Sequence, residues 1–231
     1  MDLLRAVIVG AAGTPYHDGL FFFDVFFPST YPNEPPQVHY HSGGLELNPN
    51  LYSDGFVCLS LLNTWDGSTE EQWIPKRSTM LQVLLSIQAL VLNAKPFFNE
   101  PGVDNEEEGE KQSCEYNEST FIQSCRTMLF SLRKPPRHLE EYVVGHFRVR
   151  AHAILVACKA YMDGAQVGCL AEDVDESDKS CSDDFKGQVG SMVKTLVAAF
   201  VKNGSKDCKP FLPQTKKSSH SGSRSCKRKI R

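Results

Sequence analysis

The sequence predicts an α/β fold of the α+β kind, in which a small antiparallel sheet precedes a set of helices. Three short runs rich in aromatic and branched residues lie between residues 3 and 41, separated by glycine- and proline-rich turns. From residue 79 onward, apolar residues instead recur at helical spacing. Hydrophobic residues make up 41% and charged residues 23% of the 231 residues, close to the average for soluble proteins, which argues against wholesale disorder or a fibrous architecture.

The three predicted strands form a meander. The first covers residues 3–9, an apolar run that ends at a Gly-Ala-Ala-Gly turn. The second covers residues 20–27, with the sequence LFFFDVFF, and the third covers residues 37–41, which alternate around Val38 and Tyr40. Four prolines between residues 28 and 36 forbid a continuing strand and make a stiff connection.

The next regular element is a helix over residues 79–92. Before it, residues 45–62 contain the turn signals Asn-Pro-Asn and Ser-Asp-Gly around Cys58, which predicts a loop that carries a thiol. Thr79 can cap the helix, and Gln82 follows three residues later, as in a capping box. Met80, Leu84, Ile87 and Val91 fall on one helical face. We therefore expect this helix to be buried.

The second half of the chain is predicted to be helical, with an acidic loop before it at residues 104–110. Amphipathic helices are expected at about 119–132 and 138–162, and a short helix at 185–201. Residues 172–184 are acidic and polar without an apolar period, so no regular structure is expected there.

The predicted organisation has four parts. These are a core at 1–163, an acidic linker at 164–184, a short helix at 185–203 and a disordered basic tail at 204–231. From Lys206 onward there are nine Lys or Arg and one acid, so the tail carries +8 whereas the rest of the chain carries −11. The tail and the rest of the chain therefore carry net charges of opposite sign.

Composition also limits the class of protein. The eight cysteines are scattered without a C-x-x-C pair, which argues against a disulfide scaffold and a structural zinc site, so no metal is expected. No apolar run reaches the roughly 18 residues of a membrane-spanning helix, and the N-terminus is unlike a signal peptide. We expect a cytoplasmic protein.

Lys216-Lys217 and residues 227–231 resemble a bipartite nuclear import signal, although a solvated tail or a nucleic-acid contact has the same pattern. Nucleic-acid binding fits poorly with a body of charge −11.

Several motifs in residues 13–101 occur together, in one order and spacing. They are Gly13-Thr14-Pro15-Tyr16, Phe21-Phe22-Phe23-Asp24-Val25, Phe27-Pro28, Tyr31-Pro32-x-x-Pro35-Pro36, Pro49-Asn50, Gly55-x-x-Cys58-Leu59, Trp73-x-Pro75 and Leu84-Leu85-Ser86-Ile87-Gln88. This set resembles the ubiquitin-conjugating (E2) enzyme family, over roughly residues 1–160. Residues 48–52, 58–65 and 97–100 further resemble the large E2/E3 hybrid subgroup, which includes the plant phosphate-homeostasis enzymes.

The resemblance implies a UBC-like fold, which is a four-stranded antiparallel meander with a central helix packed across it and helices after it. The family begins with an amphipathic helix, whereas Met1 lies here at the first strand, so we expect a core that lacks that helix. The resemblance implies neither a metal nor an organic cofactor, because the ATP of the pathway is consumed by the activating enzyme.

The resemblance assigns the catalytic roles. Cys58 is expected to be the nucleophile that carries ubiquitin as a thioester, since a thiolate both attacks and leaves readily. Asn50 matches the asparagine that stabilises the oxyanion, although such a residue also commonly closes an Asx-turn. Asn48 stands where the family usually has histidine. No histidine lies between His41 and His138, which disfavours a Cys/His protease.

Other candidates would activate the attacking lysine or bind partners. A carboxylate near the incoming ammonium would help to deprotonate it, and Glu70, Glu71, Asp104 and Glu118 are candidates; the alternative is that they are solvated loop charges. Trp73 and Pro75 match the second loop that binds RING-type ligases, whereas Asn33 stands where the first such loop offers a bulky apolar residue.

The sequence therefore predicts an E2 ubiquitin-conjugating transferase that receives ubiquitin on Cys58 and passes it to a substrate lysine. The expected partners are ubiquitin, the ubiquitin-activating enzyme, a RING-type ligase and substrate proteins, with no nucleic acid. The alternative is an inactive E2-like module that binds ubiquitin or a ligase but cannot be charged. Inactive variants of the fold typically lack the cysteine, so the presence of Cys58 favours the enzyme, whereas the missing first helix favours the inactive module.

Overall fold

A three-stranded antiparallel sheet forms the N-terminal part of the molecule. The computed structural model describes residues 2–103, 107–168 and 181–212. Strands β1 (Leu3–Val9), β2 (Leu20–Phe26) and β3 (Gln37–Tyr40) pair in chain order, which confirms the predicted meander. The described residues hold three strands rather than four; beyond β3, the sheet continues only as the isolated bridge between His39 and Phe56.

Both faces of β2 are covered. Phe21 and Phe23 belong to one hydrophobic core, with the helix α1 (Met80–Ser86), whereas Leu20 and Phe22 belong to a second core built with the C-terminal helices. Because successive side chains of a strand point to opposite faces, a strand covered on both faces reads as a continuous apolar run. This accounts for the aromatic stretch that marks β2 in the sequence.

The helix α1 begins with the predicted capping box. The Thr79 side chain accepts from the Gln82 amide, and the Gln82 side chain accepts from the Thr79 amide. The helix continues as a π-helical turn, η2 (Ile87–Val91), in the same core. The prediction of a buried helix is right for one face only. Three leucines of the outer face are exposed: Leu81, Leu85 and Leu90.

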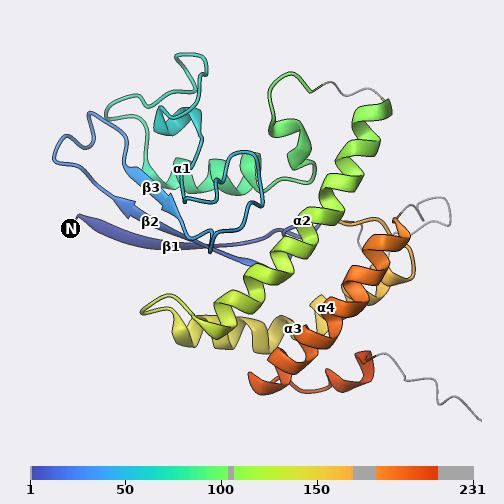
Figure 1. The fold of residues 1–231 in the computed structure, drawn as a ribbon. Coiled ribbons are helices and arrows are strands. Elements are labelled where there is room, and N and C mark those ends of the chain that lie inside the picture. The colour runs from blue at the N-terminus through green and yellow to red at the C-terminus, as the bar shows by residue number, and fades with distance from the viewer. Residues whose placement is uncertain (1, 104–106, 169–180, 213–231) are drawn as a thin grey trace, which may run out of the picture.

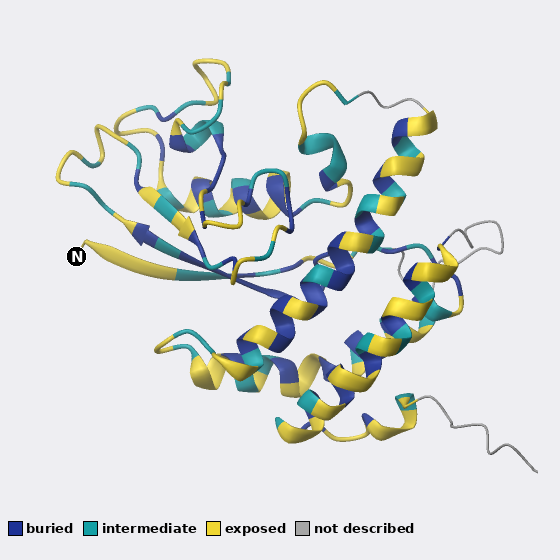
Figure 2. Cartoon of the chain, in the orientation of Figure 1, coloured by how far each residue is buried: buried dark blue, intermediate teal, exposed yellow. Residues whose placement is uncertain are grey.

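The helix α2 (Glu107–Arg133) is longer than predicted. The sequence analysis began it near residue 119 and assigned the acidic residues before it to a loop, but the structure places Glu107, Glu108 and Glu110 in its first turn. Acidic side chains near a helix N-terminus are stabilised by the helix dipole, so an acidic run there starts a helix as readily as it makes a loop. Long stretches of α2 are buried against neighbouring helices (Figure 2).

The helices α3 (Glu140–Met162) and α4 (Asp183–Lys202) complete the second core. In Figure 1, α2 crosses the molecule and α3 and α4 lie on one side of it. Residues 181–184, for which no regular structure was expected, hold the cap and first turn of α4. Residues 204–212 of the predicted disordered tail include the short helix η5 (Lys209–Phe211), and Cys208 is buried. The remainder of the tail lies outside the described residues.

A buried polar network joins the turn between β1 and β2 to α3. The His17 ring shares a hydrogen bond with Asp18 at 2.9 Å, and its other nitrogen with the Tyr161 hydroxyl, also at 2.9 Å. Arg150 donates to the Asp18 carboxylate at 2.6 Å. The sheet and the C-terminal helices are therefore connected by polar bonds as well as by apolar packing. No helix in the described ranges is long and apolar enough to cross a membrane.

Candidate active site

Asn50 and Cys58 lie next to each other. The Cys58 amide donates to the Asn50 carbonyl at 2.9 Å, and the Asn50 carboxamide donates to the Cys58 carbonyl at 3.1 Å. An isolated bridge between Leu51 and Val57 runs alongside these bonds. The two residues for which the family resemblance implies catalytic roles are therefore brought together, and the Asn50 carboxamide N–H is directed at the residue that carries the thiol.

Asn48 fixes the turn that presents Asn50. Its side chain is 1% exposed, and its oxygen accepts from the Asn50 amide at 2.8 Å. Its nitrogen donates to the Tyr16 hydroxyl at 2.8 Å and to the Val91 carbonyl at 2.7 Å. Tyr16 is fully buried and donates to the Leu47 carbonyl. Asn48 thus connects the turn to the end of the central helix.

The Cys58 thiol is covered in this conformation. Cys58 is 4% exposed, and its sulfur donates to the Thr64 carbonyl at 3.1 Å. The Thr64 hydroxyl holds the same loop, since it accepts from the Leu59 amide and donates to the Val57 carbonyl. Burial raises the pKa of the Cys58 thiol above its ordinary value. The resting sulfur is therefore a neutral thiol at neutral pH.

Among the candidate carboxylates, Glu71 lies in the loop that follows the cysteine. Its carboxylate accepts from the Ser68 amide at 2.8 Å. A side chain at Gly67 would collide with the Ser60 hydroxyl and with the Glu71 carboxylate, so Gly67 allows these two residues to approach. Ser60 follows Cys58 by two residues and begins the short helix η1 (Ser60–Leu62). This places the Glu71 carboxylate close to Ser60, two residues after Cys58.

The structure does not place the other three candidate carboxylates, Glu70, Asp104 and Glu118, beside the loop that carries Cys58. Glu70 is exposed in the same loop. Asp104 lies outside the described residues. Glu118 is on α2, and its two carboxylate oxygens accept from the amide and the hydroxyl of Ser182 at the start of α4. Glu118 therefore holds the N-terminus of α4 and is not brought to Cys58.

The three candidate partner-binding residues lie on two loops that touch. The Trp73 indole is buried, donates to the Pro32 carbonyl at 2.9 Å and packs against Tyr31 at a ring distance of 5.8 Å. Asn33 follows Pro32 and is exposed, as is Pro75. Trp73 thus holds the two loops together, while Asn33 and Pro75 are available to a partner.

Sequence reasoning missed two residues of the site. Thr64 was not singled out, although it lies six residues after Cys58 and both its hydroxyl and its carbonyl hold the cysteine loop. Tyr16 was named only as part of a motif, and no role was predicted for it.

No grouping of three or more His, Cys, Asp or Glu side chains in the described part of the chain could hold a metal ion. The chemistry that the site offers is that of one thiol, one amide donor and one nearby carboxylate.

Comparisons with known proteins agree with this geometry. The family model for ubiquitin-conjugating enzymes matches residues 1–125. A probable ubiquitin-conjugating enzyme E2 26 of Arabidopsis thaliana is 53% identical over 238 residues, covering 99% of this chain and 44% of that protein. A putative ubiquitin-conjugating enzyme E2 38 of the same plant is 56% identical over 214 residues, covering 90% of this chain and 66% of that protein.

A more distant relative is a hybrid enzyme. The human dual E2 ubiquitin-conjugating enzyme/E3 ubiquitin-protein ligase BIRC6 is 40% identical over 173 residues, covering 72% of this chain and 4% of that protein. The chain thus spans less than two thirds of the length of each of these three relatives. The family model nonetheless covers more than half of the chain and includes both Asn50 and Cys58, so this chain belongs to the ubiquitin-conjugating enzyme family.

Proposed function

We propose that this chain is a ubiquitin-conjugating transferase that carries ubiquitin on Cys58 and passes it to a lysine. The observation that supports the proposal is the mutual pairing of Asn50 and Cys58, in which the Asn50 carboxamide donates to the backbone carbonyl of the residue that carries the thiol. In the first step, the Cys58 thiolate attacks the thioester carbonyl at the C-terminus of ubiquitin, and the thiolate of the activating enzyme leaves. In the second step, a lysine amine attacks the new thioester, and the Cys58 thiolate leaves.

Charging requires the thiol to be uncovered. The Cys58 sulfur is bonded to the Thr64 carbonyl, and its pKa is raised by burial. Attack therefore needs the segment around Thr64 to move aside and the thiol to lose its proton. Once the thioester has formed, the sulfur no longer has a proton to donate to Thr64, which removes the bond that closes the loop.

Asn50 stabilises the transition state in this proposal. Its carboxamide donates to the Cys58 carbonyl in the resting structure. In the proposed reaction, the same N–H turns to the acyl oxygen of the thioester. Negative charge develops on that oxygen when the lysine attacks. Removing one such donor typically raises a reaction barrier by about 2.7–4 kcal/mol.

Glu71 is the carboxylate to which we assign lysine activation. It is ordered by the Ser68 amide and lies close to Ser60, in the loop of the nucleophile. A nearby carboxylate attracts the lysine ammonium and accepts the proton that the amine releases as the amide forms. The ordered Glu71 is better placed than Glu118, which is bonded to Ser182.

A charging assay tests the function. Incubation with the ubiquitin-activating enzyme, ATP and ubiquitin is expected to give an adduct that a thiol reductant releases. The Cys58→Ser variant is expected to give only an ester that resists the reductant, and Cys208→Ser is the matched control, because Cys208 is also buried but lies far along the chain in the C-terminal segment.

Two outcomes would contradict the proposal. Failure of the wild-type protein to form any adduct would rule out the enzyme, and ubiquitin binding without charging would favour an inactive E2-like module. For the second step, Asn50→Ala should slow discharge to lysine by roughly 10²–10³-fold. Discharge at the wild-type rate would show that Asn50 only closes the turn.

A further inference from the structure

The outer face of α3 carries an exposed apolar stripe. Its members, Tyr142, Val149 and Val156, are 44%, 77% and 36% exposed. They follow one another at intervals of seven residues, or two helical turns, so they lie in one line along the helix. The buried face of α3, which includes Phe147 and Ile154, lies opposite. Apolar side chains gathered in one line, rather than scattered singly, indicate a surface that binds a partner.

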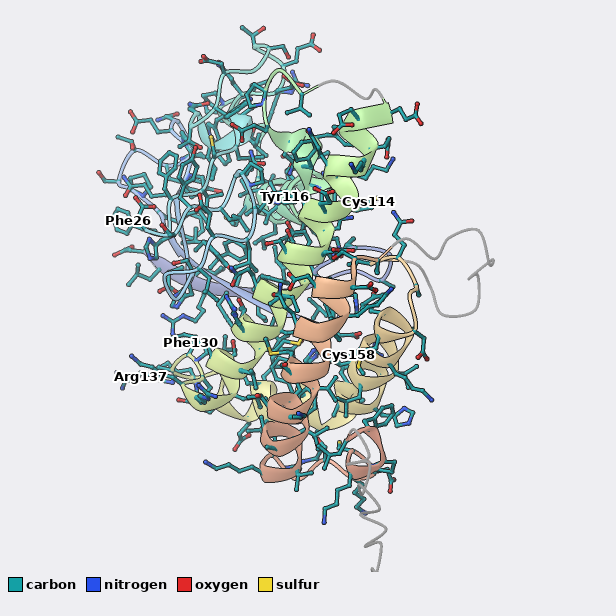
Figure 3. The ribbon with its side chains drawn as sticks, turned by 45° about the vertical axis from the view of Figure 1, so that its right-hand side comes forward. Phe26, Cys114, Tyr116, Phe130, Arg137 and Cys158 are labelled. Carbon is teal, nitrogen blue, oxygen red and sulfur yellow. The ribbon has the colours of Figure 1, made fainter. Side chains whose placement is uncertain are left out.

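A glycine opens the stripe to close approach. Gly145 lies between Tyr142 and Val149 on the same face, and a side chain built there would meet nothing within 4 Å. Glycine is less favourable than alanine inside a helix, because it loses more conformational freedom on folding. At this open position it lets another backbone come near. Figure 3 labels Arg137, just before α3, and Cys158, near its end, which mark the extent of the stripe.

The charged residues in the middle of α3 are engaged on either side of the stripe. On one side, His146 bonds to the Asp18 carbonyl and Arg150 to the Asp18 carboxylate, in the turn between β1 and β2. On the other side, Arg148 donates to the Asn203 carbonyl at the end of α4. Both arginines are therefore turned toward the body of the protein, and the middle of the stripe is left apolar.

The two ends of the stripe carry opposite charges. Glu141 lies at its start and Lys159 at its end, and both side chains are exposed. Neither has an ion-pair partner among the described residues. A two-fold axis across the middle of the helix exchanges its ends, so an antiparallel second copy sets each Glu141 beside the Lys159 of the other copy. A parallel copy would instead bring like charges together.

We propose that the outer face of α3 binds a second copy of this chain, and that the two α3 helices pack antiparallel in a homodimer. In this register Gly145 faces Val156 of the other copy, and large side chains meet small ones. The interface goes beyond the proposed function, because the transfer chemistry does not use it. Val57 and Leu59, on either side of Cys58, belong to the core of α1, whereas α3 belongs to the core on the other face of the sheet.

The size of the face fits a weak dimer. A helix of 23 residues is about 34 Å long and about 10 Å in diameter, so half of its surface is roughly 500 Å². Two copies would then bury roughly 1,000 Å² in total, which is near the lower limit for a specific interface. We therefore expect an equilibrium between monomer and dimer that depends on concentration.

Sedimentation equilibrium of the whole chain, over a wide range of concentrations, tests the interface. The wild-type mass is expected to approach that of two chains at high concentration. Val149→Glu sets a charge in the middle of the stripe and should raise the dissociation constant by about tenfold or more. Leu81→Glu is the matched control and should leave it unchanged. Leu81 is 65% exposed on α1, which lies on the other side of the sheet from α3 (Figure 1).

Exchange of the end charges tests the antiparallel arrangement. Glu141→Lys and Lys159→Glu should each raise the dissociation constant by about three- to tenfold, because like charges then meet at both ends of the interface. The double variant restores opposite charges and should recover the wild-type constant. Both changes also oppose the helix dipole, so an effect through helix stability alone would be larger in the double variant.

The outcomes separate this proposal from the proposed function. A wild-type mass of one chain at every concentration would overturn the dimer. Equal constants for wild type and Val149→Glu would overturn the outer face of α3 as the interface, and a double variant that does not recover would overturn the antiparallel arrangement. Val149→Glu should still form the thioester on Cys58 at the wild-type rate. A failed charging assay therefore contradicts the proposed function and leaves the sedimentation result to decide the dimer.

Discussion

Asn48 illustrates how much one buried side chain contributes to the site. Both ends of its carboxamide are bonded, to Asn50, Tyr16 and Val91, and it is almost completely enclosed. A buried polar group that loses its partner costs about 1–3 kcal/mol. The hydrogen bonds of Asn48 therefore fix the turn that presents Asn50.

We expect Asn48→Ala to destabilise the protein and to slow charging. The Asn50 amide would lose its acceptor, and the Val91 carbonyl would keep only the weaker bond from Asn99, so the free energy of unfolding should fall by about 1–3 kcal/mol in urea titrations. Asn33→Ala is the control, since Asn33 is exposed and its loss should change stability by no more than about 0.5 kcal/mol. Equal unfolding midpoints for the two variants would contradict the role given to Asn48.

At the scale of elements, the start of α4 depends on a contact with α2. The Ser182 hydroxyl accepts from the Phe185 amide as an N-cap and donates to the Glu118 carboxylate at 2.6 Å. The same carboxylate accepts from the Ser182 amide. One acidic side chain of α2 therefore orients the first turn of α4, which is where the second core closes.

The cap of α4 can be tested with two serines of the same segment. Ser182→Ala should lower the free energy of unfolding by about 1–2 kcal/mol, as loss of an N-cap does. Ser191→Ala is the matched control, because Ser191 is exposed within α4 and bonds only to the Gly187 carbonyl of its own helix. A smaller loss for Ser182→Ala than for Ser191→Ala would show that the cap does not stabilise the helix.

At the scale of the whole molecule, the two hydrophobic cores are held together by β2 and by the network around Asp18. Burial acts to raise the pKa of Asp18, but the hydrogen bonds from His17 and Arg150 outweigh it and hold that pKa below its ordinary value. A carboxyl with a lowered pKa stabilises the fold above its ordinary value of about 4, and this contribution is lost as the pH falls through the lowered pKa. The junction between sheet and helices should therefore weaken in acid.

We expect Asp18→Asn to lower the free energy of unfolding by about 1–3 kcal/mol near pH 7, because His17 and Arg150 lose a charged partner. The side chain of Arg150 is 47% exposed, so solvent screening keeps the loss in the lower part of that range. Near pH 3 the gap between variant and wild type should narrow. Asp163→Asn, at the exposed end of α3, is the control, and a gap independent of pH would contradict the assignment.

The sequence by itself determined much of the local structure, and through its motifs it predicts Cys58 as the nucleophile. The strands could be read from short apolar runs and the cap of α1 from Thr79 and Gln82, because these features depend on neighbours a few residues away. Cys58 and Asn50 were found through their motifs. The start of α2 was misplaced, because an acidic run is compatible with both a loop and a helix N-terminus.

Only the tertiary structure decided what these residues contact. The Cys58 thiol donates to the Thr64 carbonyl, Glu118 bonds to the cap of α4, and Glu71 lies close to Ser60. The tertiary structure also brought residues of all three strands, of the proline-rich connection and of the turn at 54–57 around one hollow, although these segments are separate in the sequence. The physical reason is that hydrogen bonding and burial act through space, between residues that no spacing along the chain brings together.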